Sequence, residues 1–253
     1  MNHQTFVGSG LRRIVIAVSF LVGSVPAVLA EQLISANQFD CVVYPNETVN
    51  LGTVAAGVLS QVGVGRGDIV KKGQVLATVE SRVEAANVEA ARTRLAFEEI
   101  KLKRNTKLAK EKIISIEQLE SIEMEADLAA IALKKNQALL ELRKIKSPFD
   151  GLVTEKLLST GDYVAGDTVL RVAQMHPLKV EARVPASLYA GVRVGMRAKI
   201  QFKEAVGGEY EGIISVRDNV LDAANSNFRV RIDLPNPDLK LPAGVRCSVQ
   251  FLN

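Results

Sequence analysis

Few side chains in this sequence have the types and spacing that catalysis or metal binding requires. Two histidines and two cysteines occur in 253 residues, and His3 and His176 stand far apart. This leaves little for a zinc site or a catalytic triad. Met124, Met175 and Met196 lie on different segments, so they offer soft metals no cluster. The sequence also lacks Walker A and Gly-x-Ser-x-Gly motifs. We therefore expect no enzymatic activity, no metal site and no cofactor.

Two short stretches invite a cofactor interpretation and fail its requirements. The run from Gly63 to Gly67 is followed by Asp68, where a dinucleotide-binding loop needs its third glycine. Lys71 and Lys72 have no Met-Lys-Met turn around them and are interpreted as solvated charges, not as a lipoyl or biotinyl attachment site.

The first 30 residues have the layout of an export signal. They contain no acidic side chain, carry Arg12 and Arg13, and then run apolar from Ile14 to Ala30. We expect cleavage after Ala30, and the alternative is an uncleaved anchor, since about 17 apolar residues are barely enough to span a bilayer.

Cys41 and Cys247 would enter an oxidising compartment in an exported chain. Two thiols there can form one disulfide, or they can remain as two small buried side chains. The sequence leaves both possibilities open.

The composition is that of a chain that folds in water, with 47% hydrophobic and 24% charged residues. Aromatic residues make only 5% and tryptophan is absent, which argues against stacking on nucleic-acid bases. The formal net charge of +4 includes Arg12 and Arg13, so the processed chain would carry about +2, and no nucleic-acid partner is indicated.

One repeat appears when the chain is compared with itself. Its first copy starts at Gly57 and continues with Gly67-Asp68-Ile69-Val70, and its second starts at Gly151 and continues with Gly161-Asp162-Tyr163-Val164. Each copy alternates apolar and polar residues between glycine turns, which predicts short strands. Because some 25 residues cannot bury a core alone, we expect the two copies to form one β-sandwich.

The segment between the copies is predicted to be a helical hairpin. Proline and glycine are absent from about Arg82 to Arg143, and residues that favour helices dominate. Two heptad stripes indicate two helices packed as an antiparallel coiled coil. A capping box, Ser115-Ile116-Glu117-Gln118, places the start of the second helix near Ser115. The stripe positions are Val88, Leu95, Leu102 and Ala109 in the first helix and Leu119, Ile122, Ala126, Ala129, Leu133 and Leu140 in the second.

The remainder of the chain alternates in the manner of an antiparallel β-barrel of about six strands. A strand from Phe39 to Tyr44 could join it, which would bring Cys41 towards Cys247. The predicted fold is thus mostly β, with a split lipoyl-like β-sandwich, a long helical hairpin and an antiparallel barrel. The expected units are a signal peptide at 1–30, an N-terminal strand that joins the barrel at 31–53, the first lipoyl-like half at 54–80, the hairpin at 81–146, the second half at 147–174, and the barrel at 175–253.

This order of units resembles the periplasmic adaptors, or membrane fusion proteins (HlyD/AcrA-like), of bacterial tripartite efflux pumps. The stretches 65–76 and 147–151 resemble the two lipoyl half-motifs of that family, and 234–244 resembles the end of its barrel. Many family members carry a further membrane-proximal domain after the barrel, whereas this sequence stops about ten residues after its Pro-Ala-Gly turn. We therefore expect docking on a transporter to depend on the barrel.

The resemblance also implies a contact site at the hairpin tip. Family members carry an arginine, a leucine and a serine there, and the matching positions are Arg104, Leu108 and Ser115. These residues are expected to contact an outer-membrane channel, although the capping box alone explains Ser115, Leu108 could belong to the seam between the helices, and Arg104 could be a solvated charge.

The function that follows from the resemblance is that of a periplasmic adaptor between an inner-membrane RND exporter and a TolC-like outer-membrane channel. The adaptor would be associated with the inner membrane through its transporter and would assemble as a hexamer. An ABC-type exporter as partner, or an exported coiled-coil scaffold without a channel, are the alternatives.

Overall fold

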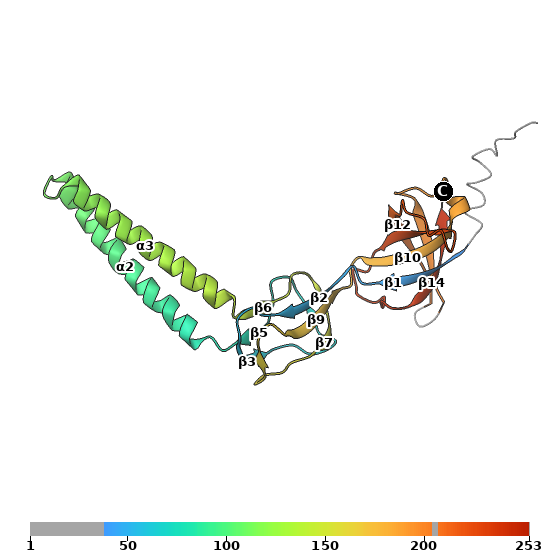
Figure 1. Ribbon diagram of the computed structural model, residues 1–253, viewed down its shortest axis with the longest axis horizontal. Coiled ribbons are helices and arrows are strands. Elements are labelled where there is room, and N and C mark those ends of the chain that lie inside the picture. The colour runs from blue at the N-terminus through green and yellow to red at the C-terminus, as the bar shows by residue number, and fades with distance from the viewer. Residues whose placement is uncertain (1–37, 204–206, 253) are drawn as a thin grey trace, which may run out of the picture.

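The computed structural model describes residues 38–203 and 207–252, and it places three units in a row (Figure 1). A helical hairpin forms one end, a β-sandwich lies in the middle, and a β-barrel forms the other end. The predicted signal peptide at 1–30 lies outside the described residues. In the part of the chain that the structure describes, no helix combines the length and the apolarity that crossing a membrane needs.

The sandwich consists of two four-stranded sheets with the orders β2-β9-β7-β4 and β6-β5-β3-β8. Both copies of the repeat contribute to each sheet, because each copy sends its shortest strand, β4 or β8, to pair with the other copy. The prediction that the two copies fold together is therefore confirmed. The strands are β2 (Glu47–Gly52), β3 (Gly57–Val62), β4 (Ile69–Val70), β5 (Val75–Val79), β6 (Lys144–Lys146), β7 (Gly151–Lys156), β8 (Tyr163–Val164) and β9 (Thr168–Gln174).

The Gly-Asp pairs of the repeat have equivalent roles in the two halves. The Asp68 carboxylate accepts a hydrogen bond from the Gly65 amide at 2.7 Å, and the Asp162 carboxylate accepts one from the Ser159 amide at the same distance. Gly67 and Gly161 have φ of 94° and 96°, a region that favours glycine. The repeated spacing within the sequence thus reflects two equivalent turns.

The barrel is closed, with the strand order β1-β10-β13-β12-β11-β14. Its interior holds alternate apolar side chains from every strand, such as Val180, Val230 and Phe251, all of which are fully buried. The strands are β1 (Phe39–Tyr44), β10 (Leu178–Pro185), β11 (Arg197–Phe202), β12 (Glu209–Arg217), β13 (Asn227–Leu234) and β14 (Arg246–Leu252), with the short 3₁₀ helix η1 (Ala186–Leu188) after β10.

The segment 31–53 differs from the single barrel strand that the sequence predicts. Its first strand, β1, does close the barrel between β10 and β14, but β2 pairs with β9 in the sandwich. The chain passes from the barrel to the sandwich at Asn46, whose amide donates to the carbonyl of Gln174 at 2.9 Å. Periodicity could not reveal this, because both strands alternate in the same way and only their pairing partners differ.

A buried asparagine ties the barrel to the end of the sandwich. Asn236 is 3% exposed, and its side-chain amide donates to the carbonyls of Met175 and Leu241 and accepts from the Leu241 amide, each at 3.0 Å. Its backbone amide donates to Nδ1 of His176. The one histidine of the described residues therefore has a structural partner at the junction between the units.

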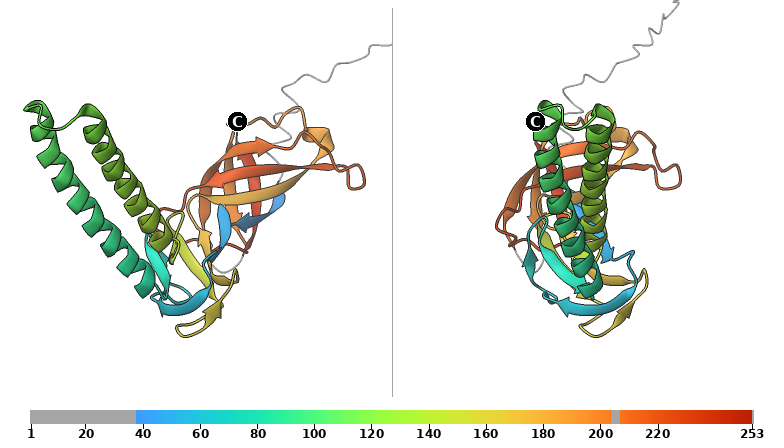
Figure 2. Two further views of the ribbon diagram at one scale, coloured as in Figure 1. Left: turned by 60° about the vertical axis from the view of Figure 1, so that its left-hand side comes forward. Right: turned by 90° about the vertical axis from the view of Figure 1, so that its left-hand side faces the viewer.

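The hairpin is formed by α2 (Arg82–Lys110) and α3 (Ile116–Glu141), which lie side by side in both figures that show the whole chain (Figures 1 and 2). At 1.5 Å per residue the 29-residue α2 is roughly 44 Å long. At the base, Arg143 ion-pairs with Glu84 at 2.6 Å and donates to the carbonyl of Ala56 at 2.9 Å. The predicted hairpin is thus present, while its coiled-coil supercoil stays a prediction.

Candidate functional site: the tip and outer face of the hairpin

The turn at the tip is a regular helix stop. The amides of Lys112 and Ile113 donate to the carbonyls of Ala109 and Leu108, both at 2.9 Å. Lys112 has φ of 57°, so these bonds form a Schellman motif with lysine in the left-handed position that glycine usually occupies. Because the last carbonyls of α2 are paired in this way, the tip has a defined shape.

Ser115 is held by local hydrogen bonds. Its hydroxyl oxygen accepts from the Gln118 amide at 3.2 Å, and the Gln118 side chain accepts from the Ser115 amide at 3.1 Å. The predicted capping box is therefore confirmed. A hydrogen bond from the Ser115 side chain also lowers the pKa of the exposed Glu117 carboxyl. The start of α3 accounts for most of the hydrogen-bonding capacity of Ser115.

Arg104 and Leu108 lie on the last two turns of α2 before the tip. Arg104 is exposed, and within residues 38–203 and 207–252 its guanidinium has no hydrogen bond or ion pair. Leu108 is half-buried, so its side chain is shared between the hairpin and solvent. The structure thus brings the three predicted residues to one end of the hairpin and leaves Arg104 the most available for a partner.

Two apolar side chains at the tip lie outside the contact site that the sequence predicts. Ile113 and Ile116 are 63% and 73% exposed on either side of the turn. Neither belongs to the predicted heptad stripes. An apolar residue outside those stripes is the pattern in the sequence that could have indicated an exposed apolar side chain. Apolar side chains held in solvent at the end of a rigid hairpin are typical of a contact surface.

A second apolar stripe runs along the outside of each helix. On α2, Phe97 and Ile100 are exposed and continue to Arg104 at helical spacing. On α3, Met124, Leu128 and Ile131 are similarly exposed. The predicted inner stripes are at least half-buried, so each helix has one apolar face for its partner helix and another that faces solvent.

The seam between the helices contains one buried acid. Glu98 is 1% exposed, and its carboxylate lies 2.5 Å from Nη2 of Arg94 without hydrogen-bond geometry and 3.6 Å from Nζ of Lys101. Lys101 in turn pairs with Glu125 of α3, and this contact raises the pKa of the lysine. Glu98 takes a position between Leu95 and Leu102 where a continuous seam would have an apolar side chain.

Cys41 and Cys247 are direct neighbours on β1 and β14. Their Cα atoms are 4.9 Å apart, and the structure joins them as a disulfide inside the barrel. Both side chains are buried. The pair links the strand that follows the N-terminal segment to the last strand of the chain.

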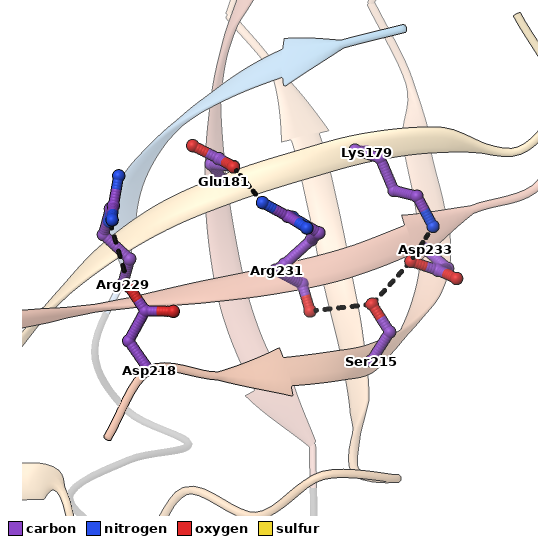
Figure 3. Close-up of polar contacts among 7 residues, drawn as sticks. All are labelled: Lys179, Glu181, Ser215, Asp218, Arg229, Arg231 and Asp233. Carbon is purple, nitrogen blue, oxygen red and sulfur yellow. Dashed lines mark hydrogen bonds and ion pairs between the residues drawn. The ribbon is translucent and has the colours of Figure 1, made fainter. Parts of the chain in front are cut away.

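Charged side chains form a ladder on the outside of the barrel (Figure 3). Arg231 pairs with Glu181 at 2.9 Å, and Arg229 pairs with Asp218 at 3.0 Å. Burial raises the pKa of Asp233, but hydrogen bonds from Lys179 and Ser215 outweigh it and hold that pKa below its usual value. Such exposed pairs contribute little to the stability of the fold.

Two family models together cover almost all of the described chain. Residues 47–174 match the CzcB-like, barrel-sandwich hybrid domain, and residues 178–253 match the CusB-like, beta-barrel domain. The chain belongs to the membrane fusion protein family. The predicted resemblance is therefore confirmed.

Several curated proteins are similar in sequence. The chain is 27% identical over 205 residues to an uncharacterized protein of Haemophilus influenzae, covering 80% of this chain and 54% of that protein. It is 26% identical to the cobalt-zinc-cadmium resistance protein CzcB of Cupriavidus metallidurans (81% and 42%), and 24% identical to the macrolide export protein MacA of Yersinia pestis (89% and 69%). The chain spans about half the length of the first two relatives.

Solved structures show the same fold. A putative efflux transporter of Bacteroides eggerthii has a TM-score of 0.70 at 20% identity, covering 85% of this chain and 68% of that chain. A MacA–MexA chimera with the hairpin of Pseudomonas aeruginosa MexA has the same score at 21% identity (85% and 80%). Among the residues described here, no group of three histidine, cysteine or acidic side chains is placed to hold a metal ion.

Proposed function

We propose that this chain is a non-enzymatic periplasmic adaptor that links an inner-membrane exporter to a TolC-like outer-membrane channel. The observation that carries the proposal is the projecting hairpin, whose tip presents the exposed Ile113 and Ile116 together with Arg104, which has no side-chain partner among the described residues. Family membership and the opposite placement of hairpin and barrel support it.

Such an adaptor acts by binding and positioning its partners, without chemical catalysis. The exposed stripes of α2 and α3 fit the helices of a partner, because an apolar face with i, i+3 and i+4 spacing packs on another helix. Arg104 would donate to carbonyls or carboxylates of the channel, and Leu108 with the two isoleucines would supply apolar contacts. If these contacts are better in the open channel than in the closed one, the adaptor shifts the channel towards the open state.

An RND transporter is the proposed inner-membrane partner, and the barrel is the proposed docking unit. Six copies, stacked through the sandwich, would form a funnel around the transport path. The alternative partner is an ABC-type exporter, which the same fold could serve. An exported scaffold without a channel is the remaining alternative, and the exposed tip of the hairpin disfavours it.

Charge reversal at the tip tests the channel contact. The Arg104→Asp variant should remain folded and exported but should bind the channel at least about tenfold more weakly, because a carboxylate would face the partner's acceptors. One readout is the yield of cross-links to the channel in cells. The other is resistance, which should fall as it does when the adaptor is deleted.

Lys103→Asp is the matched control. It makes the same change of charge at the exposed neighbouring residue, whose side chain points in a different direction from α2. Equal losses in the two variants, or normal efflux with Arg104→Asp, would contradict the contact.

The transporter class is decided by cross-linking the exported adaptor in cells and identifying its membrane partners by mass spectrometry. Recovery of an RND transporter together with an outer-membrane channel is expected. Recovery of an ABC transporter would replace the proposed partner, and recovery of neither would leave the scaffold alternative.

A further inference from the structure

The end of the barrel that points away from the sandwich has an unusual surface. Strand β10 starts at Leu178, directly after the sandwich, so its last residue Pro185 and the paired Asn227 of β13 lie at the far end. The loop after β10 and the turn between β12 and β13 therefore form this far end, and Figure 2 shows the turn reaching beyond the rest of the barrel. We call the surface made by residues 183–197 and 217–229 the far-end surface.

Apolar side chains project into solvent from both loops. Val220 is 84% exposed, Val194 is 62% exposed and Leu221 is 41% exposed. Val192 and Phe228 from the same two segments are buried in the barrel core, so the apolar side chains here divide between the core and solvent.

The two loops are held firmly in this arrangement. Arg217 donates from Nη1 to the carbonyls of Tyr189 and Val192 at 3.2 and 2.9 Å, and its guanidinium lies 4.1 Å from the centre of the Tyr189 ring. The Tyr189 hydroxyl donates to the side chain of Asn219 at 2.9 Å. These contacts brace the two loops against each other beside the exposed valines.

The far-end surface is also basic. It contains five arginines and two aspartates. Both carboxylates are already engaged, Asp218 by Arg229 and Asp222 by the amides of Ala224 and Asn225. Arg183 and Arg193 are exposed and have no hydrogen bond or ion pair from their side chains to the described residues, although Arg183 contributes weakly to the lowered pKa of Asp222. Arg183 also stands directly opposite Arg229 across the strand pair, an arrangement that an external anion would relieve.

We propose that the far-end surface rests on a bilayer that contains anionic phospholipids. Exposed aliphatic tips flanked by arginines that have no partner in the described part of the chain have the chemistry of an interfacial contact, in which the tips enter the headgroup region and the guanidiniums bind phosphates. The hairpin lies at the other end of the molecule (Figure 1), so the contact leaves its tip free to reach a distant partner. The inference does not depend on which transporter the chain serves.

A probe at position 220 reports this contact whether or not the N-terminal segment also holds the protein on the membrane. The exported full chain carrying Val220→Cys is labelled with an environment-sensitive fluorophore, while Cys41 and Cys247 are bonded to each other and stay unlabelled. The vesicles contain phosphatidylethanolamine and phosphatidylglycerol in a ratio of about 7 to 3. The expected result is a blue shift together with quenching by spin-labelled lipid.

The control label is at Lys240→Cys, which is exposed on the loop between β13 and β14, near the sandwich. It should show neither change. The Arg183→Glu and Arg193→Glu pair of substitutions should weaken the vesicle binding measured at position 220 by at least about fivefold for each arginine, because each substitution removes an attracted guanidinium and adds a carboxylate that an anionic surface repels. Lys240→Glu should leave it unchanged.

Three results would overturn the proposal. The probe at position 220 could remain in water while the protein is bound to vesicles, it could respond equally on vesicles of phosphatidylcholine alone, or it could become buried only when a transporter is reconstituted in the same vesicles. The last result would show that the far-end surface docks on protein and not on lipid.

Discussion

At the scale of single residues, the structure separates side chains that serve the fold from those that are free to serve a partner. Ser115 is engaged by the start of α3, whereas Arg104, at the same end of the hairpin, has no partner among the described residues. The residue type alone does not make this distinction, since both serine and arginine are common at contact surfaces. The difference comes from the number of local hydrogen-bond partners that the turn provides.

The disulfide between Cys41 and Cys247 should contribute to the stability of the barrel. Replacement of both Cys41 and Cys247 by alanine should lower the free energy of unfolding of the barrel by about 2–4 kcal/mol, because the bond restricts a long loop in the unfolded chain. Urea unfolding followed by tyrosine fluorescence measures the change. Thiol labelling of the exported protein with and without reductant tests the bond itself, and labelling without reductant would contradict it.

At the scale of elements, the inner seam of α2 is interrupted by an acidic residue. Glu98 occupies a seam position with its carboxylate buried and not hydrogen-bonded. A buried ion pair of this kind costs desolvation and is commonly no better than an apolar residue.

The Glu98→Leu variant should therefore melt at a higher temperature than the wild type when the helical signal at 222 nm is followed, and the hairpin should gain on the order of 1–3 kcal/mol of stability. The matched control is Glu99→Leu, at an exposed position one residue further along α2. A lower melting temperature for Glu98→Leu would show that its pairs with Arg94 and Lys101 stabilise the hairpin.

The base of the hairpin has its own dependence on pH. Hydrogen bonds from Lys144 and Lys146 lower the pKa of Glu141 to about 2. A folded-state pKa below the ordinary value means that this group stabilises the folded state at neutral pH, and that its contribution disappears as the pH falls from about 4.5 towards 2. Because Glu141 is half exposed, solvent screening keeps the effect small, below about 1 kcal/mol.

Urea unfolding of the wild type and of Glu141→Gln at pH 5 and pH 3 measures this contribution. The difference between the two proteins should shrink at the lower pH. If the difference in the free energy of unfolding were the same at pH 5 and pH 3, Glu141 would not be the source of this pH dependence.

At the scale of the whole molecule, the hairpin acts as a spacer between its tip and the sandwich (Figure 2). Deletion of residues 86–92 from α2 together with 134–140 from α3 removes one heptad from each arm and retains the register of Lys101 with Glu125. The hairpin becomes roughly 10 Å shorter. Under the proposed function, the shortened protein should still cross-link to a transporter but should no longer cross-link to an outer-membrane channel.

A control variant of unchanged length, with alanine at the exposed positions of these two heptads, should retain both partners. Normal channel cross-linking by the shortened protein would show that the reach of the hairpin is not what the function requires.

The sequence by itself determined the local elements and their order. The Gly-Asp repeats, the capping box at Ser115 and the helical composition of 82–143 are short-range patterns, and each one acts through neighbours a few residues away. The pairing of distant segments was decided only by the tertiary structure. Strand β2 pairs in the sandwich and not in the barrel. Glu98 is buried, while Ile113 and Ile116 are exposed. Arg217 braces the loops after β10 and β12 together. These features depend on which surfaces meet once the chain is compact, and a pattern of alternation is the same whichever partner a strand or a helix finally packs against.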